Sequence, residues 1–275
     1  AGLAIGDKGN NKIRIVEEGA VRPIVDLARF PDVEIQRSAA LALTAMALGE
    51  HQVTKTGIMV EDGLLPLLSL AASNDTDCVR AAIYCMGCLA ENDEVRARLV
   101  EIGGLVTAVA HGKSDDIEIK RNCAYFLALL CEAMEFHDAL AREGGIEVII
   151  EMACLEDIEC QEYAAFSLAH LASNRDYQTY IAKAGGLKPL VAMMSVHAEP
   201  RHYAGLALLK VGGVGCVWLV LLLFGWCGSV VVWLFGCWGF FVSHFSLYLP
   251  SSLLPFLFLL PCCSWPTISK TTSAL

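Results

Sequence analysis

One pattern of residues occurs five times along this chain, with a period of 41 to 44 residues. Each copy contains a short turn, usually Gly-Gly, and the turn residues Gly19, Gly63, Gly104, Gly145 and Gly186 are 44, 41, 41 and 41 positions apart. An Ala-rich stretch begins about 17 residues after each turn. A fixed period of 20 to 50 residues is typical of stacked repeat arrays. The sequence therefore predicts a solenoid in which each unit packs on its neighbours.

Apolar residues recur within each unit at positions i, i+3, i+4 and i+7, which is the spacing of an amphipathic helix. We expect a short helix before the turn, a second helix after it and a longer, Ala-rich third helix. Glycine suits the turn because the residue that ends a helix often takes a positive φ. The Asp/Asn/Ser-rich loops at 73–77 and 112–116 predict N-caps for the third helices.

These segments resemble the armadillo repeat family over roughly residues 10–210, with five units in phase. The resemblance implies an all-α fold, a right-handed α-solenoid of three-helix repeats whose third helices line a concave groove. Among armadillo proteins, the sequence looks most similar to vacuolar-membrane scaffolds. Residues 3–11 resemble the end of a preceding third helix, and the last third helix stops at Lys210. We therefore interpret residues 1–210 as a solenoid truncated at both ends.

The resemblance also implies a protein-interaction scaffold without a catalytic centre. Importin-type armadillo grooves carry a Trp and, one turn later, an Asn on each third helix. The residues here that match the Trp are Leu41, Tyr84, Tyr125 and Phe166, and those that match the Asn are Ala45, Cys88, Leu129 and His170. Because neither Trp nor Asn occupies these positions, a nuclear-import function is disfavoured.

Three arginines precede the Trp-equivalent positions by one helical turn, and Glu162 takes that place in the fourth unit. Residues four apart share a helix face, so basic and aromatic side chains are expected side by side. We predict that the groove binds an extended or helical partner segment with acidic and apolar side chains, as catenin-type grooves do. The predicted lining residues are Arg37, Arg80, Tyr84, Arg121, Tyr125, Leu129, Phe166 and His170. The alternative is that the arginines form ion pairs within the solenoid and the aromatic residues pack between repeats.

Other chemistry is disfavoured by spacing and charge. Cys85-x-x-Cys88 lies inside a predicted helix with no second pair at ligand spacing, so we expect core cysteines and no metal or cofactor. The scattered histidines form no recognisable catalytic order, and His170 is more simply a polar groove residue than a pH-sensitive one. Residues 1–210 carry a formal charge of −11, which disfavours nucleic acid as a partner.

The last part of the chain differs sharply in composition from the rest. Of 50 charged residues, 49 lie in residues 1–210, and residues 211–275 contain only Lys270. Residues 214–242 contain no charge and no proline, a run longer than the roughly 20 residues that cross a bilayer. One interpretation is therefore a membrane-anchored armadillo adaptor with a genuine transmembrane segment within residues 211–242.

The codon composition of this tail favours another interpretation. In residues 211–242, all but Ser229 are amino acids that have codons made only of G and T. In residues 245–266, 18 of 22 are Phe, Ser, Leu or Pro, which have codons made only of C and T. A G/T-rich run before a pyrimidine tract is typical of a translated intron, and the change falls inside a predicted helix. We interpret residues 211–275 as a retained intron or a gene-model artefact.

The cysteines bear on the compartment. Seven of twelve lie in residues 1–210, an odd number placed among apolar residues at helical spacing, which is typical of a reducing environment. We therefore expect a cytoplasmic protein, with vacuolar or endomembrane association implied by the resemblance. A membrane location is expected only if the tail is genuine.

Overall fold

The computed structural model describes residues 10–196 and 200–212, and the predicted tail lies outside them apart from residues 211 and 212. The chain divides into two units, Ala1–Phe224 and Gly225–Leu275, and every described residue belongs to the first. The described residues are helical and connected by turns, with no strand among them. The prediction of an all-α fold is confirmed.

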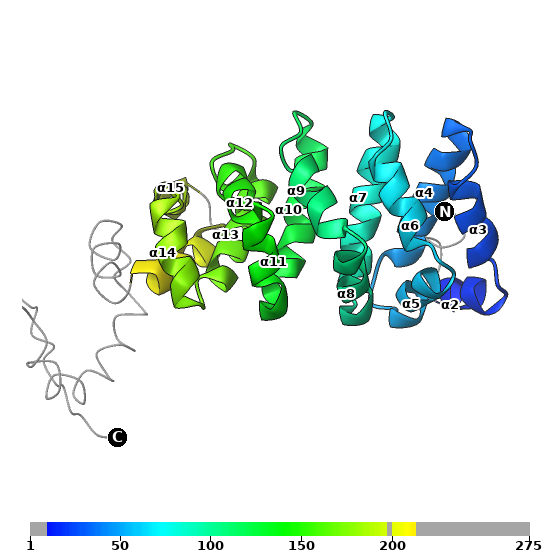
Figure 1. Cartoon of the computed structure of the whole chain (residues 1–275), viewed down its shortest axis with the longest axis horizontal. Helices are drawn as coiled ribbons and strands as arrows, with labels where there is room; N and C mark the ends of the chain where they lie inside the picture. Colours follow the sequence, from blue (N-terminus) through cyan, green and yellow to red (C-terminus); the bar gives the residue numbers. More distant parts are fainter. Residues whose placement is uncertain (1–9, 197–199, 213–275) are drawn as a thin grey trace, which may run out of the picture. The chain divides into compact units, whose positions relative to one another are not determined.

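Each repeat contains three helices, as predicted, and successive repeats follow one another along the described part (Figure 1). The first helices are α2 (Asn10–Glu17), α5 (Gln52–Val60), α8 (Asp93–Glu101), α11 (His137–Arg142) with the preceding 3-10 turn η1 (Met134–Phe136), and α14 (Arg175–Lys183). The second helices are α3 (Val21–Ala28), α6 (Leu64–Ala71), α9 (Gly104–His111), α12 (Gly145–Ala153) and α15 (Leu187–Val196). The third helices are α4 (Val33–Ala47), α7 (Thr76–Ala90), α10 (Ile117–Glu132) and α13 (Ile158–Leu171), and residues 200–212 are helical at the fifth position.

Aspartates begin four of the third helices. Asp32, Asp75, Asp116 and Asp157 have extended backbones, and each side chain accepts a hydrogen bond from a backbone N–H in the first turn. These bonds satisfy donors that a helix N-terminus otherwise leaves unpaired. The N-caps predicted from the loop composition are confirmed at 73–77 and 112–116.

The two residues of each turn have different roles. The first has a positive φ, 101° at Gly103 and 75° at Gly144, and the second packs tightly on the preceding helix. A Cβ on Gly104 would lie 2.8 Å from the carbonyl oxygen of Leu99. The sequence-based reason for glycine is therefore correct for Gly19 but wrong for Gly63, Gly104, Gly145 and Gly186, where a Cβ would clash with the preceding helix. In the second repeat, Asp62 holds the positive φ of 58°.

The core runs continuously through the stack. Neighbouring third helices pack on one another, α4 on α7, α7 on α10 and α10 on α13. In the first four repeats, the second helix also packs on the third helix of its own repeat. The buried residues are chiefly Ala, Leu, Ile, Val, Met and Cys, and they form one cluster from Val21 to Leu208. The described residues are therefore an α-solenoid of three-helix repeats, held by contacts between neighbouring repeats.

Candidate functional site

The arginines of three third helices contact the residue that caps the next third helix. Arg80 of α7 donates from Nε and Nη2 to the carboxylate of Asp116, at 3.3 and 2.5 Å. Arg121 of α10 makes the same contact with Asp157, at 3.0 and 2.6 Å, and Arg37 of α4 makes it with Asp75. Each aspartate therefore joins two repeats, since it caps its own helix and binds the guanidinium of the preceding one.

This pairing has two electrostatic effects. The hydrogen bond from Arg121 lowers the pKa of Asp157, and the same bond raises the pKa of Arg121. The sequence left open that these arginines form ion pairs within the solenoid, and the structure shows that they do. Each arginine side chain nevertheless keeps 33 to 37% of its surface exposed.

Acidic side chains outnumber basic side chains on the third helices. The third helices with their caps and C-terminal residues (32–48, 75–91, 116–132 and 157–172) hold four Lys or Arg residues and eleven Asp or Glu residues. Some of these acids also approach the arginines, such as Glu118, whose carboxylate lies 3.2 Å from Nε of Arg80. The arginines therefore lie among more numerous acidic side chains. This corrects the expectation, based on the arginines alone, that the groove would attract an acidic partner.

Aromatic side chains form a row beside the arginines. The ring centroids of Tyr84 and Tyr125 lie 6.5 Å apart, and those of Tyr125 and Tyr163 lie 5.4 Å apart, both in tilted arrangements. Tyr84 is exposed and the other two rings are half-buried. The row thus crosses α7, α10 and α13 and combines packing between repeats with an accessible surface.

Tyr125 also reaches back across α7. A Cβ on Gly87 would lie 2.7 Å from Cδ1 of Tyr125, so the absence of a side chain at Gly87 lets the ring lie against the helix. The hydroxyl of Tyr125 donates to Glu91, which also pairs with Lys55 of α5. The Lys55 side chain has no exposed surface, whereas that of Glu91 is 37% exposed. Glu91 therefore links the buried ammonium group of Lys55 to Tyr125 of the aromatic row.

A second aromatic group lies on the last described repeats. Phe166 stacks on His170 with centroids 4.3 Å apart, and Tyr203 meets Phe166 edge-on at 5.1 Å. Burial lowers the pKa of His170, and the positive charge of Lys210 lowers it further. The surroundings of His170 therefore disfavour its charged form.

The predicted site residues are spread over the four third helices α4, α7, α10 and α13. Leu41 is 55% exposed, and Leu129 is half-buried against the core cluster. Sequence reasoning missed Tyr163, which takes the place beside Tyr125 that was assigned to Phe166. It also missed the acceptors of the arginines, although Asp75, Asp116 and Asp157 are each 41 positions apart. That spacing, equal to the repeat period, is the signal that could have identified them.

Cys85 and Cys88 are buried core residues. Burial raises the pKa of the Cys88 thiol to about 11, so it stays protonated and is a poor metal ligand or nucleophile. Within residues 10–196 and 200–212, no group of three or more His, Cys, Asp or Glu side chains is arranged to hold a metal ion. In the same ranges, no helix has the length and apolar character needed to span a bilayer.

Comparison with known proteins agrees with this geometry. Residues 10–47 match the armadillo/beta-catenin-like repeat family. The chain is therefore similar to armadillo-repeat proteins in this region, and its curated relatives are vacuolar proteins of which it spans only a small part. It is 30% identical over 99 residues to Vacuolar protein 8 of Komagataella pastoris, a match that covers 35% of this chain and 16% of the relative. It is 33% identical over 95 residues to Vacuolar protein 8 of Schizosaccharomyces pombe, covering 34% of this chain and 16% of the relative.

Solved structures show the same fold. A computationally designed armadillo repeat protein for modular peptide recognition aligns with a TM-score of 0.72 at 22% identity, covering 76% of this chain and 89% of the designed one. A designed armadillo repeat protein in complex with the peptide (KR)4 aligns with a TM-score of 0.71 at 21% identity, covering 76% and 89%. Both similarities concern the fold.

Proposed function

We propose that the described repeats bind a segment of a partner protein along the third helices. The single observation that carries this proposal is the aromatic row Tyr84, Tyr125 and Tyr163, which remains partly accessible on three consecutive repeats. Exposed aromatic rings supply a large contact area at low cost in conformational entropy. Designed proteins of the same fold are described as made for peptide recognition, which supports this use of the surface.

The arginines contribute orientation rather than free charge. Nε and Nη2 of Arg121 are bound to Asp157, and no described residue accepts a hydrogen bond from its Nη1. A guanidinium fixed in this way can donate Nη1 to a backbone carbonyl or a single carboxylate of the partner without reordering. We propose this role for Arg121, because Nη1 of Arg37 and Nη1 of Arg80 already donate to Glu34 and Asp77. Arg37 and Arg80 are proposed to line the same surface, with Leu41, Leu129, Phe166 and His170 as further contacts.

The charge of the partner follows from the acids around the arginines. The sequence-based prediction of an acidic and apolar partner assumed that the arginines were free to bind it. With eleven acids and four bases along these helices, an acidic run would be repelled. The observed pairing supports a neutral or basic partner segment with apolar anchors, with at most isolated carboxylates at the arginines.

The role that we propose is that of a non-catalytic scaffold, cytoplasmic and associated with the vacuole. The relatives named Vacuolar protein 8 support this location. The alternative function, a membrane-anchored adaptor, depends on residues 211–275, of which only residues 211 and 212 are among the described residues. Membrane fractionation of the full chain against residues 1–210 would distinguish the two, since only a genuine anchor places the full chain alone in the membrane fraction.

Selection of displayed peptides on the full chain tests the proposal. We expect the selected peptides to bind Tyr84→Ala and Phe166→Ala variants at least tenfold more weakly, the loss typical of interface hot spots. A Val106→Ala variant is the matched control, because Val106 is 52% exposed on the second helix α9. Peptides that bind all three variants as tightly as the original chain would rule out this surface as the binding site.

A further inference from the structure

Lys55 differs in its contact from the corresponding residues of the other repeats. Each of those residues binds a backbone carbonyl at the end of a third helix, as Lys12 binds Leu48, Arg96 binds Ala90, His137 binds Cys131 and Gln178 binds Ala172. Lys55 instead binds the side chain of Glu91, 36 residues later in the sequence. This contact is therefore not a general requirement of how the described repeats stack.

The carboxylate of Glu91 lies beside the aromatic row. Glu91 is the C-cap of α7 and follows Tyr84 by seven residues, a spacing that places both on one side of the helix. One carboxylate oxygen accepts from Lys55 and the other from the hydroxyl of Tyr125, whose ring centroid is 6.5 Å from that of Tyr84. Burial raises the pKa of Tyr125, and the bond to Glu91 raises it further, so the phenol remains a donor. Two donors thus fix an acceptor that is still 37% exposed.

The charge of Glu91 is balanced at this place. The Lys55 side chain has no exposed surface, and a buried ammonium group is costly unless it is paired. A second ammonium group is close, because burial lowers the pKa of Lys12 and the charge of Lys55 lowers it further. The Tyr84 end of the row therefore lacks the excess of negative charge that the third helices have as a whole.

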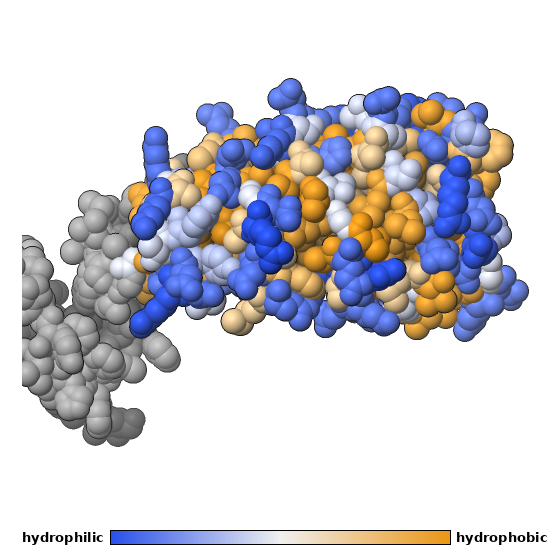
Figure 2. Space-filling model, in the orientation of Figure 1, coloured by the Kyte–Doolittle hydropathy of each residue, from blue (hydrophilic) through white to orange (hydrophobic). Residues whose placement is uncertain are grey.

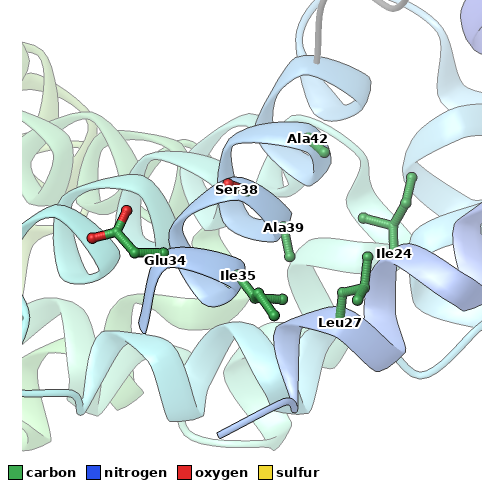
Figure 3. A pocket seen from close by; sticks show the side chains of 7 residues that line it. All are labelled: Ile24, Leu27, Glu34, Ile35, Ser38, Ala39 and Ala42. Atoms are coloured by element: carbon green, nitrogen blue, oxygen red, sulfur yellow. The ribbon is translucent and has the colours of Figure 1, made fainter. Parts of the chain in front are cut away.

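This place belongs to an open surface. The cavity of about 370 Å³ that Figure 3 shows lies between α3 and α4, and neither Lys55 nor Glu91 lines it. On the face of the described repeats that Figure 2 draws, hydrophilic side chains lie among apolar ones rather than in one continuous block. Selection for charge on such a surface depends on individual side chains.

We propose that Lys55 and Glu91 set the charge specificity of the aromatic row, so that the partner residue lying against Tyr84 and Glu91 is an uncharged hydrogen-bond donor rather than Lys or Arg. This inference rests on the proposed function. Glu91 accepts the partner's donor through a remaining lone pair, whereas Lys55 repels a cation placed there. Lys55 itself is a positioning residue, since its buried side chain acts on the partner only through Glu91.

A lysine scan of a bound peptide tests the proposal on the full chain. A peptide selected by display is made with each residue in turn replaced by Lys and, separately, by Asn. We expect one position at which Lys weakens binding by about tenfold while Asn is tolerated. In a Lys55→Met variant, which leaves the charge of Glu91 unbalanced, the same lysine peptide should regain that tenfold. The absence of such a position, or a loss that persists in Lys55→Met, would overturn the proposal.

Two further variants separate the possible causes. Gln178→Met changes the corresponding residue of the last described first helix, so it should leave the penalty for lysine unchanged, and relief of the penalty there as well would contradict a role for Lys55. Melting curves show whether Lys55→Met is folded, and the scan on the original chain decides the matter if it is not. Tyr84→Ala tests the proposed function separately. If Tyr84→Ala weakens the peptide and Lys55→Met leaves the penalty unchanged, the binding surface stands and the charge specificity falls.

Discussion

Arg80 of α7 binds the carboxylate of Asp116, the residue whose side chain also caps α10 by accepting the N–H of Ile119 at 3.1 Å. The same relationship joins Arg37 to Asp75 and Arg121 to Asp157. One carboxylate thus begins a helix and fixes that helix to the repeat before it. Helix capping and repeat stacking therefore depend on the same three aspartates, Asp75, Asp116 and Asp157.

The two roles of Asp157 can be separated by substitution. Asp157→Asn keeps an oxygen that can cap α13 and loses the charge that binds Arg121, whereas Asp157→Ala loses both. We expect Asp157→Ala to lower the free energy of unfolding by about 1 kcal/mol more than Asp157→Asn, measured by urea denaturation. Asp115→Ala, an exposed acid that caps no helix, serves as the control and should change stability by less than about 0.5 kcal/mol. Equal losses for the two Asp157 variants would argue against the capping role.

Acid should weaken the solenoid through these aspartates. The hydrogen bonds from Arg80 and Arg121 hold the pKa values of Asp116 and Asp157 below their ordinary range, so the unfolded chain binds more protons in acid than the folded one. The stabilisation is fully present above the unfolded pKa of about 3.9 and is lost as pH falls through the folded values. We expect the free energy of unfolding to fall below about pH 4, and to fall less steeply in an Arg121→Leu variant. Parallel pH curves for the two proteins would contradict this linkage.

The contact between Gly87 and Tyr125 predicts an unusual mutational effect. In a helix, Gly→Ala normally stabilises by up to about 1 kcal/mol. At Gly87 the new Cβ would meet the Tyr125 ring, and overpacking typically costs about 1–3 kcal/mol, so we expect a net loss of about 1 kcal/mol. Removing the ring should reverse the sign, so that Gly87→Ala stabilises a Tyr125→Leu variant in urea denaturation. A destabilising effect that persists without the ring would place the clash elsewhere.

Asp62 has a strained backbone conformation. It takes a φ of 58° at the turn where other repeats have glycine, and its carbonyl accepts a hydrogen bond from Arg29, which a substitution would retain. We expect Asp62→Gly to raise stability by about 1 kcal/mol, since an L-residue pays roughly that much in this conformation. The reciprocal change, Gly103→Ala at a φ of 101°, should lower stability by a similar amount. Thermal melts of both variants check the pair, and the same sign for both would be inconsistent with φ as the cause.

The repeat, the three helices of each unit and the helix caps could be predicted from the sequence because they depend on short-range chemistry. Apolar spacing and Asp-rich loops are local signals, and they located α4, α7, α10 and α13 correctly. The roles of the two turn residues were harder to separate, because Gly103 and Gly104 are adjacent glycines that meet different constraints.

The side-chain pairs between repeats could not be predicted in the same way. Arg121 and Asp157 are 36 residues apart, and whether they meet depends on how far α13 is displaced along α10. The same displacement brings Tyr163, not Phe166, beside Tyr125. Matching helices by sequence position alone assumes that residues at equivalent positions of neighbouring third helices lie side by side. The acceptors and the true aromatic neighbour appear only once the lateral register is known.

We propose that the row of aromatic residues Tyr84, Tyr125 and Tyr163 on the third helices is a binding surface for a partner segment. Photo-cross-linking tests it most directly, with a benzophenone side chain placed at Tyr84 in one variant and at Val106 in another, each mixed with a peptide selected on the full chain. The account predicts a cross-linked product from position 84 and none from position 106. Cross-linking from Val106 without any from Tyr84 would contradict it.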